Sequence, residues 1–408
     1  MSETLQRLSL HMQRAVQGEV TIARSDGAEP WSFTYSIDAS CDAALTMPRT
    51  LHTHSWNGIL PAFEQHLPEM DLGLFPLAIW KLITRDSAGL LWVAGQRRLG
   101  RLRFTRPGES LPPVAASGLT AADIARATHG DSLLADLLSR MTSLPGVSGV
   151  QPKLLLPLME HGSEPPRALA DTHLLKGNRP EYAYATTVEA ATLTLAHACG
   201  LPVPPRTLSA DGRLLAVERF DLDAQGEPLG FDEACSLMGL WARDKYLPSC
   251  EQLHKALLAF IPPAERLAFT RQFFTLLAFN LLIENGDAHC KNFGLLYEQA
   301  NAAGLAPVYD VLTTTCFEGL QRDVPALSLA GRKVWGDWQG FARVAVARGL
   351  RPVEVRQLLT ELGETLAAQM RLTAKFSDQV PAAAPLLLRM HDIWQRSLVR
   401  LQTYLMTR

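Results

Sequence analysis

Hydrophobic and polar residues follow two different patterns along this chain. The first half consists mainly of short apolar runs of strand length, separated by polar turns and a few helical stretches. Strands are predicted over residues 153–159, in a segment that ends near Lys176, and over residues 213–222. Between the last two, a helix is predicted to stop at Gly200, because Pro202 lies just beyond it and this order is typical of helix ends.

From Asp232 onward the spacing of apolar residues is mostly helical. Residues 265–285 carry apolar side chains on nearly every face, which predicts a helix in the interior of a larger lobe. The last ~60 residues also have a helical period. The pattern therefore predicts an α+β protein in which a β-containing half precedes a helical half.

Two segments indicate how the N-terminal part is divided. Residues 90–104 predict a β-hairpin with Gly95 near its turn. Residues 106–123 hold three prolines and two glycines, a composition typical of a linker. With 408 residues the chain is too long for one simple core. The predicted units are residues 1–110, 111–225 and 226–408.

Composition and charge argue against several classes of protein. Apolar residues make up 47% and charged residues 20% of the chain, as in ordinary globular proteins. A net charge of −2 gives no overall attraction for nucleic acid or an anionic membrane. With no signal-peptide core and no run of ~18 uncharged apolar residues, we expect no membrane span and a cytoplasmic location. The six scattered cysteines form no CxxC pair, which favours reduced thiols over disulfides or a zinc site.

A cluster of polar residues interrupts the most apolar part of the chain. The segment ENGDAHCKN follows the predicted interior helix and places Asp287 and Asn292 five residues apart; Asp310 follows in LAPVYDVLT. Carboxylate and amide oxygens are ligands that Mg²⁺ takes beside phosphates, and an aspartate near an attacking hydroxyl can accept its proton. Because the Asp-x-x-x-x-Asn spacing is that of the protein-kinase catalytic loop, we predict a metal–phosphate cleft here.

Segments that would complete such a cleft precede this cluster. The loop PGVSGVQPK has two glycines and a serine, and its backbone N–H groups could cover phosphates. Lys176 ends a strand, where a phosphate-binding lysine would lie, and Glu189 in the next helix could pair with it. The segment AVERFD could connect two lobes and offer backbone groups to a purine. Each feature alone has a plainer explanation, such as a surface lysine, a first-turn helix charge or a structural histidine at His289, so the ordered set is the stronger signal.

This ordered set resembles the HipA family of serine/threonine kinases, the toxin half of bacterial toxin–antitoxin pairs. The matching segments are SGVQPKLLL, THLLKG, VEAATLTLAHACGLPVPP, LLAVERFD, FNLLIENGDAHCKNFGLLY and APVYDVL. DAHCKN is the most specific, because the family's DAHxKN replaces the HRD-type loop of eukaryotic kinases. The N-terminal part matches more loosely, through ALTMPRTLHTHSWNGILPAFEQHLPE and TRDSAGLL. The resemblance implies a two-lobed, protein-kinase-like fold with a small N-terminal subdomain.

The resemblance also implies roles for individual residues. Asp287 is expected to be the catalytic base, Asn292 and Asp310 to hold Mg²⁺, and Lys176 to contact the phosphates of ATP. The remaining expected site residues are His289 in the catalytic group and Ser148, Gly149, Val150, Glu189, Glu218, Phe220 and Lys291 in the nucleotide-binding group.

Two of these expectations concern the edges of the nucleotide site. Glu218 and Phe220 are expected at the adenine hinge, through their backbone groups. The resemblance also implies that Ser148 can be autophosphorylated, as the loop serine is in this family. The modification would inhibit the kinase, because a phosphate on this loop would compete with the γ-phosphate. Pro152 departs from the family pattern, in which an acidic residue is common, and it stiffens the loop.

Substrate and partners are implied by the resemblance alone. Family members phosphorylate aminoacyl-tRNA synthetases and arrest translation, and they bind a helix-turn-helix antitoxin that brings them to DNA indirectly. Two alternatives stay open from the sequence. The protein could be a non-catalytic partner of such an antitoxin in operon autorepression, or it could be a kinase of small molecules.

Overall fold

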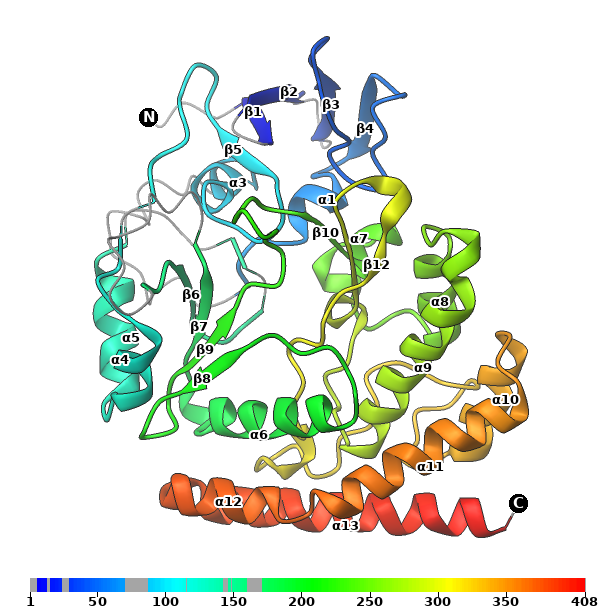
Figure 1. Cartoon of the computed structure of the whole chain (residues 1–408). Coiled ribbons are helices and arrows are strands. Elements are labelled where there is room, and N and C mark those ends of the chain that lie inside the picture. The colour runs from blue at the N-terminus through cyan, green and yellow to red at the C-terminus, as the bar shows by residue number, and fades with distance from the viewer. Residues whose placement is uncertain are drawn as a thin grey trace.

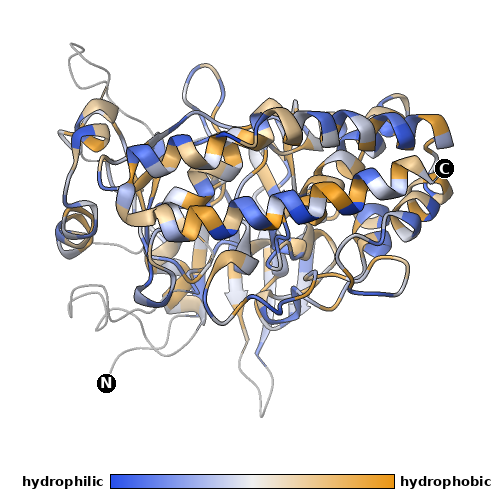
Figure 2. Cartoon of the chain, turned by 90° about the horizontal axis from the view of Figure 1, so that it is seen from below, coloured by the Kyte–Doolittle hydropathy of each residue, from blue (hydrophilic) through white to orange (hydrophobic). Residues whose placement is uncertain are grey.

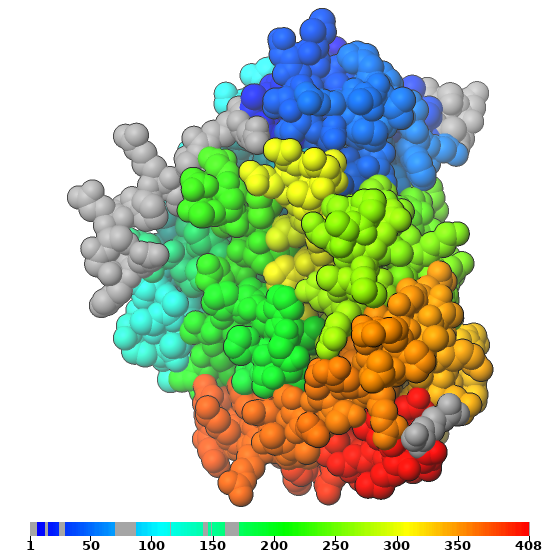
Figure 3. Space-filling view, turned by 45° about the vertical axis from the view of Figure 1, so that its right-hand side comes forward, coloured from blue at the N-terminus to red at the C-terminus, as the bar shows by residue number. Residues whose placement is uncertain are grey.

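The computed structural model describes residues 6–12, 15–23, 29–69, 87–114, 116–141, 146–147, 149–159 and 171–407. Within them the chain forms an N-terminal β-subdomain, a β-rich lobe and a larger helical lobe (Figure 1). In Figure 3 the N-terminal subdomain covers one end of the molecule, and the C-terminal helices form the opposite end. The predicted α+β class and two-lobed arrangement are confirmed.

The N-terminal subdomain is built around a five-stranded antiparallel sheet in the order β4-β3-β2-β1-β5. Buried and less buried residues alternate along β3, as expected for a strand with one face on a core. In that core the ring of Phe63 meets the rings of Phe33 and Phe104 edge to face. The elements are β1 (Arg7–Met12), β2 (Ala15–Ile22), β3 (Pro30–Tyr35), β4 (Thr53–Asn57), β5 (Arg103–Thr105), α1 (Pro61–Glu64) and α3 (Ser87–Gly95).

The hairpin predicted over residues 90–104 is wrong. Residues up to Gly95 belong to helix α3, and β5 pairs with β1 instead of with a neighbouring strand in sequence. Leu91 of α3 packs into the N-terminal core while Val93 packs into the next lobe, so the apolar residues serve two cores and show no clear helical period. Gly95 permits close packing, because a Cβ there would lie 2.8 Å from the ring of Phe104.

The β-rich lobe contains a four-stranded antiparallel sheet in the order β6-β7-β9-β8, and the three predicted strands are present in shorter form. Lys153 of β6 pairs directly with Lys176 of β7. Because opposed residues on neighbouring strands point to the same face, the two lysines share one face of the sheet. The elements are β6 (Lys153–Leu156), β7 (His173–Lys176), β8 (Arg206–Leu208), β9 (Leu215–Glu218), α4 (Ala121–Arg126), α5 (Gly130–Ser139) and α6 (Ala185–Ala198).

The helical lobe surrounds α9, which is buried on most faces as the sequence predicted. The helices α8, α11 and α13 pack against it. Seen from below in Figure 2, the C-terminal helices carry mixed polar and apolar residues, as expected for helices at a surface. The helices are α7 (Ala234–Leu237), α8 (Cys250–Leu258), α9 (Arg266–Leu282), α10 (Trp338–Ala347), α11 (Pro352–Ala368), α12 (Leu372–Gln379) and α13 (Ala384–Met406).

A small antiparallel sheet, which the sequence reading did not predict, supports the helical lobe. Its order is β10-β11-β12, with β10 at Gly230–Glu233, β11 at Gly294–Tyr297 and β12 at Gly304–Leu305. The strands have four, four and two residues, too few to give a clear alternation. β11 begins two residues after Asn292, so this sheet fixes the chain at the exit of the predicted catalytic loop.

The largest core joins the two lobes. Val188 of α6 and Val217 of β9 belong to the same cluster as Phe273 of α9, so packing is continuous across the limit predicted at residue 225. The domain limits at residues 110 and 225 stay predictions. In the described part of the chain, no helix is long and apolar enough to cross a bilayer.

Candidate active site

The DAHCKN segment begins five residues after Leu282, the last residue of α9, and belongs to the helical lobe. Asn285 stabilises the turn between them: its Nδ2 donates to Asn280 Oδ1 (2.8 Å), and its Oδ1 accepts from the backbone N–H of Asp287 (3.2 Å). The backbone N–H of Gly286 donates to Thr314 Oγ1 (2.7 Å). Because these polar groups have partners, a polar segment can follow a buried helix at little cost.

Asp287, Asn292 and Asp310 come together on one side of a cleft. The Nδ2 group of Asn292 donates to the backbone carbonyl of Asp287 (2.9 Å) and to that of Asp310 (3.3 Å). Since the amide nitrogen is used in this way, the Oδ1 atom is left as the acceptor of this side chain. All three residues line a cleft of about 530 Å³, together with Gly149 and Lys153. This volume is in the range of small-molecule sites.

Two lysines of the β-rich lobe reach Asp310 of the helical lobe. Lys176 Nζ lies 2.6 Å from Glu189 Oε1 and also donates to Asp310 Oδ1. Lys153 Nζ lies 3.4 Å from Asp310 Oδ2. Both lysine side chains and Glu189 are buried, whereas Asp310 keeps 28% of its side chain exposed. The pairing of Lys176 with Glu189 is therefore present in the structure.

These charges stabilise one another. Burial alone would lower the pKa of Lys176, but the Asp310 and Glu189 carboxylates outweigh it and raise that pKa above its usual range. Burial would raise the pKa of Asp310, but Lys153 and Lys176 hold it well below its usual range. Burial does raise the pKa of Glu189, the more enclosed carboxylate. At neutral pH, Lys176 is therefore cationic and Asp310 anionic.

The donor set fits Mg²⁺ bound together with a nucleotide. Among the described residues, no group of three or more His, Cys, Asp or Glu side chains could hold a metal by itself. Asp310 and Asn292 are a sparse set, which suits Mg²⁺ because this ion keeps several waters and takes further oxygens from phosphates. In the structure, Lys153 and Lys176 both pair with Asp310. A magnesium nucleotide would offer a cation to Asp310 and phosphate anions to the two lysines in place of these pairs.

A narrower cavity of about 50 Å³ borders the cleft and shares Lys153 and Asp310 with it. Glu218 and Phe220 line this cavity, where the sequence predicts the adenine hinge. The ring of Phe220 stacks on that of Tyr309, with centroids 5.6 Å apart. The cavity thus offers an aromatic wall and the backbone that follows β9, a combination suited to a flat heterocycle.

Part of the predicted phosphate loop also lies at the cleft. Gly149 has a backbone φ of +101°, and a Cβ there would lie 2.5 Å from Lys153 Nζ. The position therefore favours glycine for both its conformation and its space. Val150 lines the cleft and is 49% exposed. Ser148 lies outside the described residues.

Lys291 is directed toward the N-terminal subdomain. Its ammonium group donates to the backbone carbonyl of Gln65 (2.6 Å) and lies 2.8 Å from Glu233 Oε2. Burial opposes the charge on Lys291, but the Glu233 carboxylate outweighs it and raises the pKa. In return, Lys291 and His66 overcome the effect of burial and lower the pKa of Glu233 to about 2. This geometry favours a role in holding the catalytic loop over a contact with nucleotide.

His289 lies behind the predicted base. Its Nε2 is 3.7 Å from Asp287 Oδ1, and burial lowers its pKa, so the ring is neutral at neutral pH. The ring packs edge-on against Tyr246, with centroids 5.0 Å apart. These contacts place His289 beside the base, and the residue lines the same cleft.

Two residues of the site were missed by the sequence reading. Lys153 lies in the quoted segment SGVQPKLLL, but its place beside Lys176 depends on the register of two strands. The hydroxyl of Tyr246 donates to Asp287 Oδ1 at 2.5 Å, although the two residues lie 41 positions apart in the sequence. No local pattern marks either contact.

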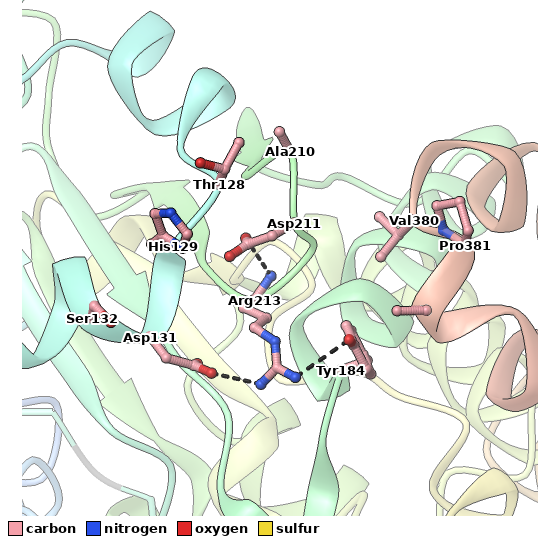
Figure 4. Close-up of a pocket in the computed structure, with 11 residues that line it drawn as sticks. Thr128, His129, Asp131, Ser132, Tyr184, Ala210, Asp211, Arg213, Val380 and Pro381 are labelled. Carbon is pink, nitrogen blue, oxygen red and sulfur yellow. Dashed lines mark hydrogen bonds and ion pairs between the residues drawn. The ribbon is translucent and has the colours of Figure 1, made fainter.

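A second hollow, of about 380 Å³, lies between the start of α5 and residues 380–382 (Figure 4). Arg213 crosses it and donates to Asp131 Oδ2 (2.6 Å) and to the hydroxyl of Tyr184 (3.3 Å). None of the residues predicted for the site lines this hollow. Because several of the predicted residues line the larger cleft instead, we take that cleft as the candidate active site.

The family of the chain follows from a comparison with known families. A family model described as HipA-like C-terminal domain matches residues 145–370, more than half of the chain. The chain belongs to the HipA family. All the HipA-family residues predicted for the site lie within the matched segment.

Two relatives and one solved structure extend the comparison. This HipA-family chain is 30% identical over 332 residues to "Putative kinase Y4mE" of Sinorhizobium fredii, with 76% of each chain covered. It is 28% identical over 204 residues to "Putative kinase" of Haemophilus influenzae, which covers 46% of this chain and 58% of that protein. A chain of the Shewanella oneidensis MR-1 toxin–antitoxin complex of HipA, HipB and operator DNA superposes with a TM-score of 0.72 at 20% identity, over 98% of this chain and 97% of that one. The likeness confirms the HipA fold.

Proposed function

We propose that this protein is an ATP-dependent serine/threonine protein kinase that works with Mg²⁺ and is the toxin of a toxin–antitoxin pair. The observation that carries the proposal is that Lys153 and Lys176 both meet Asp310, and Asp310 lines one cleft with Asp287 and Asn292. Membership of the HipA family and the two relatives named as kinases support it.

The residues of the cleft divide the work of phosphoryl transfer. Lys176, held by Glu189, and Lys153 bind the phosphates of ATP. Asp287, whose side chain is 55% exposed, accepts the proton of the acceptor hydroxyl. Asn292 and Asp310 would hold Mg²⁺, which when bound offsets negative charge on the phosphates.

Further residues would bind the adenine base, cover the phosphates and hold the catalytic loop in place. Phe220 and the backbone of Glu218 would receive the adenine in the narrow cavity. Gly149 and Val150 would lie over the phosphates. Lys291 would hold the catalytic loop through Glu233 without touching ATP.

The acceptor and the partners are proposed from the family. We expect the acceptor to be a serine or threonine of an aminoacyl-tRNA synthetase, so that its modification arrests translation. The solved relative is part of a complex with HipB and operator DNA, which supports a helix-turn-helix antitoxin as the partner of this chain. Contact with DNA would then pass through the antitoxin.

The kinase proposal is tested by incubating the protein with labelled ATP, Mg²⁺ and a panel of purified synthetases. Asp287→Ala and Asp310→Ala are each expected to lower phosphate transfer by about 10²- to 10⁴-fold, because they remove the proton acceptor or a metal ligand. The surface variant Asp392→Ala should leave the rate unchanged. Wild-type transfer by Asp287→Ala would show that the base is assigned wrongly.

Mass spectrometry of the same reaction tests the proposal that Ser148 is autophosphorylated. A phosphorylated peptide containing Ser148 is expected in the wild-type protein and should be missing in Asp287→Ala. If the wild-type protein neither binds Mg-ATP by calorimetry nor transfers phosphate, a binding role with the antitoxin replaces the kinase role. Transfer to a small metabolite but to no synthetase would indicate a small-molecule kinase.

A further inference from the structure

Tyr246 makes a contact with the catalytic loop that the roles given above do not use. It lies two residues after a 3₁₀ turn at Ala242–Asp244, and its hydroxyl donates to Asp287 Oδ1 at 2.5 Å. The His289 ring packs edge-on against its ring, and Lys245 Nζ lies 5.6 Å from the centroid. Tyr246 is 44% exposed, so the side chain borders the open part of the cleft.

The backbone beside Tyr246 is fastened to the catalytic loop. The N–H of Cys290 donates to the carbonyl of Lys245 (3.2 Å), and Lys245 Nζ lies 2.8 Å from Glu69 Oε2. The phenol therefore reaches Asp287 from a backbone that is hydrogen-bonded to the catalytic loop. Burial, assisted by the Asp287 charge, raises the pKa of Tyr246, so the hydroxyl stays protonated and remains a donor at neutral pH.

Before phosphoryl transfer, the hydroxyl of an acceptor must donate a hydrogen bond to the catalytic base. The hydroxyl of Tyr246 already donates to Asp287 in this way. We propose that Tyr246 occupies the acceptor-hydroxyl position on Asp287 and must be displaced by the substrate, so that it determines which hydroxyls reach the base. This inference rests on the proposed kinase function. Tyr246 is then a specificity-determining residue, and the place of its hydroxyl marks the acceptor end of the cleft.

The chemical step explains why such a residue is useful. The acceptor oxygen forms a bond to the γ-phosphorus, its proton passes to the Asp287 carboxylate, and the bond from the γ-phosphorus to the bridging oxygen breaks to release ADP. Water that takes the same place on Asp287 would waste ATP. While Tyr246 fills this place, its hydroxyl keeps water from Asp287 Oδ1, and only an acceptor held by further contacts in the cleft can replace the phenol.

The test measures ADP release from Mg-ATP without a protein acceptor, in wild type, Tyr246→Phe and Tyr184→Phe. Tyr246→Phe keeps the ring but loses the hydroxyl, so ATP hydrolysis is expected to rise about three- to tenfold, the range for one lost hydrogen bond. Its Mg-ATP affinity by calorimetry and its melting temperature should match wild type. Tyr184→Phe, which loses a tyrosine hydroxyl in the hollow of Figure 4, should hydrolyse ATP at the wild-type rate.

Three results would overturn the inference in distinguishable ways. Unchanged hydrolysis in Tyr246→Phe, with normal Mg-ATP binding, would mean that the phenol does not exclude water. Reduced hydrolysis with normal binding would mean that Tyr246 only holds Asp287 in its active orientation. If wild type itself bound no Mg-ATP, the proposed kinase function would fail, and this inference with it. In Tyr246→Phe, a lower KM for a synthetase that serves as the phosphate acceptor, with an unchanged KM for ATP, would give independent support.

Discussion

Single charged residues at the boundary between the lobes make up the core of the proposed site. Lys176 is held between Glu189 and Asp310, and Lys153 adds a second cation to Asp310. A buried charge is tolerated only with such partners, since removing one partner leaves the other uncompensated. The same rule applies to Glu233, which lies between Lys291 and His66. Charge pairing at these positions therefore serves stability as well as the proposed function.

Glu233 makes stability depend on pH in a defined direction. Its pKa falls from 4.5 to about 2 in the folded protein, which corresponds to roughly 3 kcal/mol of stability. Because the pKa is lowered on folding, this contribution is present above about pH 4.5 and is lost as the pH falls toward 2.

We expect Glu233→Gln to unfold at lower urea concentration than wild type at pH 7, with the difference narrowing between about pH 4.5 and pH 2. Urea denaturation at several pH values measures this. The surface variant Glu364→Gln should stay within about 0.5 kcal/mol of wild type throughout. If the difference in stability between Glu233→Gln and wild type did not depend on pH, the lowered pKa of Glu233 would not be its cause.

At the scale of elements, the catalytic loop is held at both ends and in its middle. α9 and the bonds of Asn285 fix its start, and β11 fixes its exit. In the middle, Lys291 is bound to the carbonyl of Gln65, which follows α1 of the N-terminal subdomain. A loop that must present Asp287 and Asn292 in register therefore depends on a distant part of the chain.

Lys291→Met is expected to destabilise the protein by about 3–5 kcal/mol, because Glu233 loses its buried partner. Phosphate transfer should also fall, while the affinity of the folded variant for Mg-ATP should match wild type. Denaturant titration and calorimetry measure the two effects separately. Lys255→Met, on the exposed face of α8, is the matched control. A large loss of ATP affinity in Lys291→Met would instead show that Lys291 contacts the nucleotide, as the sequence resemblance implies.

At the scale of the whole molecule, polar contacts fasten the N-terminal subdomain to the rest of the chain. The backbone N–H of Leu45 donates to Asp232 Oδ2 (2.9 Å), and that of Gly100 donates to Asp221 Oδ2 (2.6 Å). The two lobes are joined by a shared apolar core and by the lysine pairs on Asp310. A ligand that binds between the lobes should therefore stabilise the entire fold.

Mg-ATP at about 100 times its dissociation constant should stabilise the folded protein by roughly 2.7 kcal/mol and raise the melting temperature. Differential scanning calorimetry with ATP and Mg²⁺ measures this shift. ATP with excess chelator should give a smaller shift, because Asp310 and Asn292 would then lack the cation that joins them to the phosphates. No shift with Mg-ATP would speak against a nucleotide site in the cleft.

The sequence alone determined three strands of the β-rich lobe, the helix that ends near Gly200 and the interior helix α9, because hydrophobic period and helix-end residues are local signals. It also indicated Asp287, Asn292, Asp310, Lys176 and Glu189 as one set, since their spacing along the chain is characteristic. The hairpin at residues 90–104 failed because α3 packs into two cores at once, which a single local period does not show.

Only the tertiary structure decided which of these residues touch and what each contact does. Lys153 joins the site because strand register places it opposite Lys176. Lys291 faces Glu233 and Tyr246 faces Asp287, although the partners lie 58 and 41 positions apart in the sequence. Contacts of this kind depend on how separate elements pack, and packing is set by shape and burial over the whole chain, which no short sequence window contains.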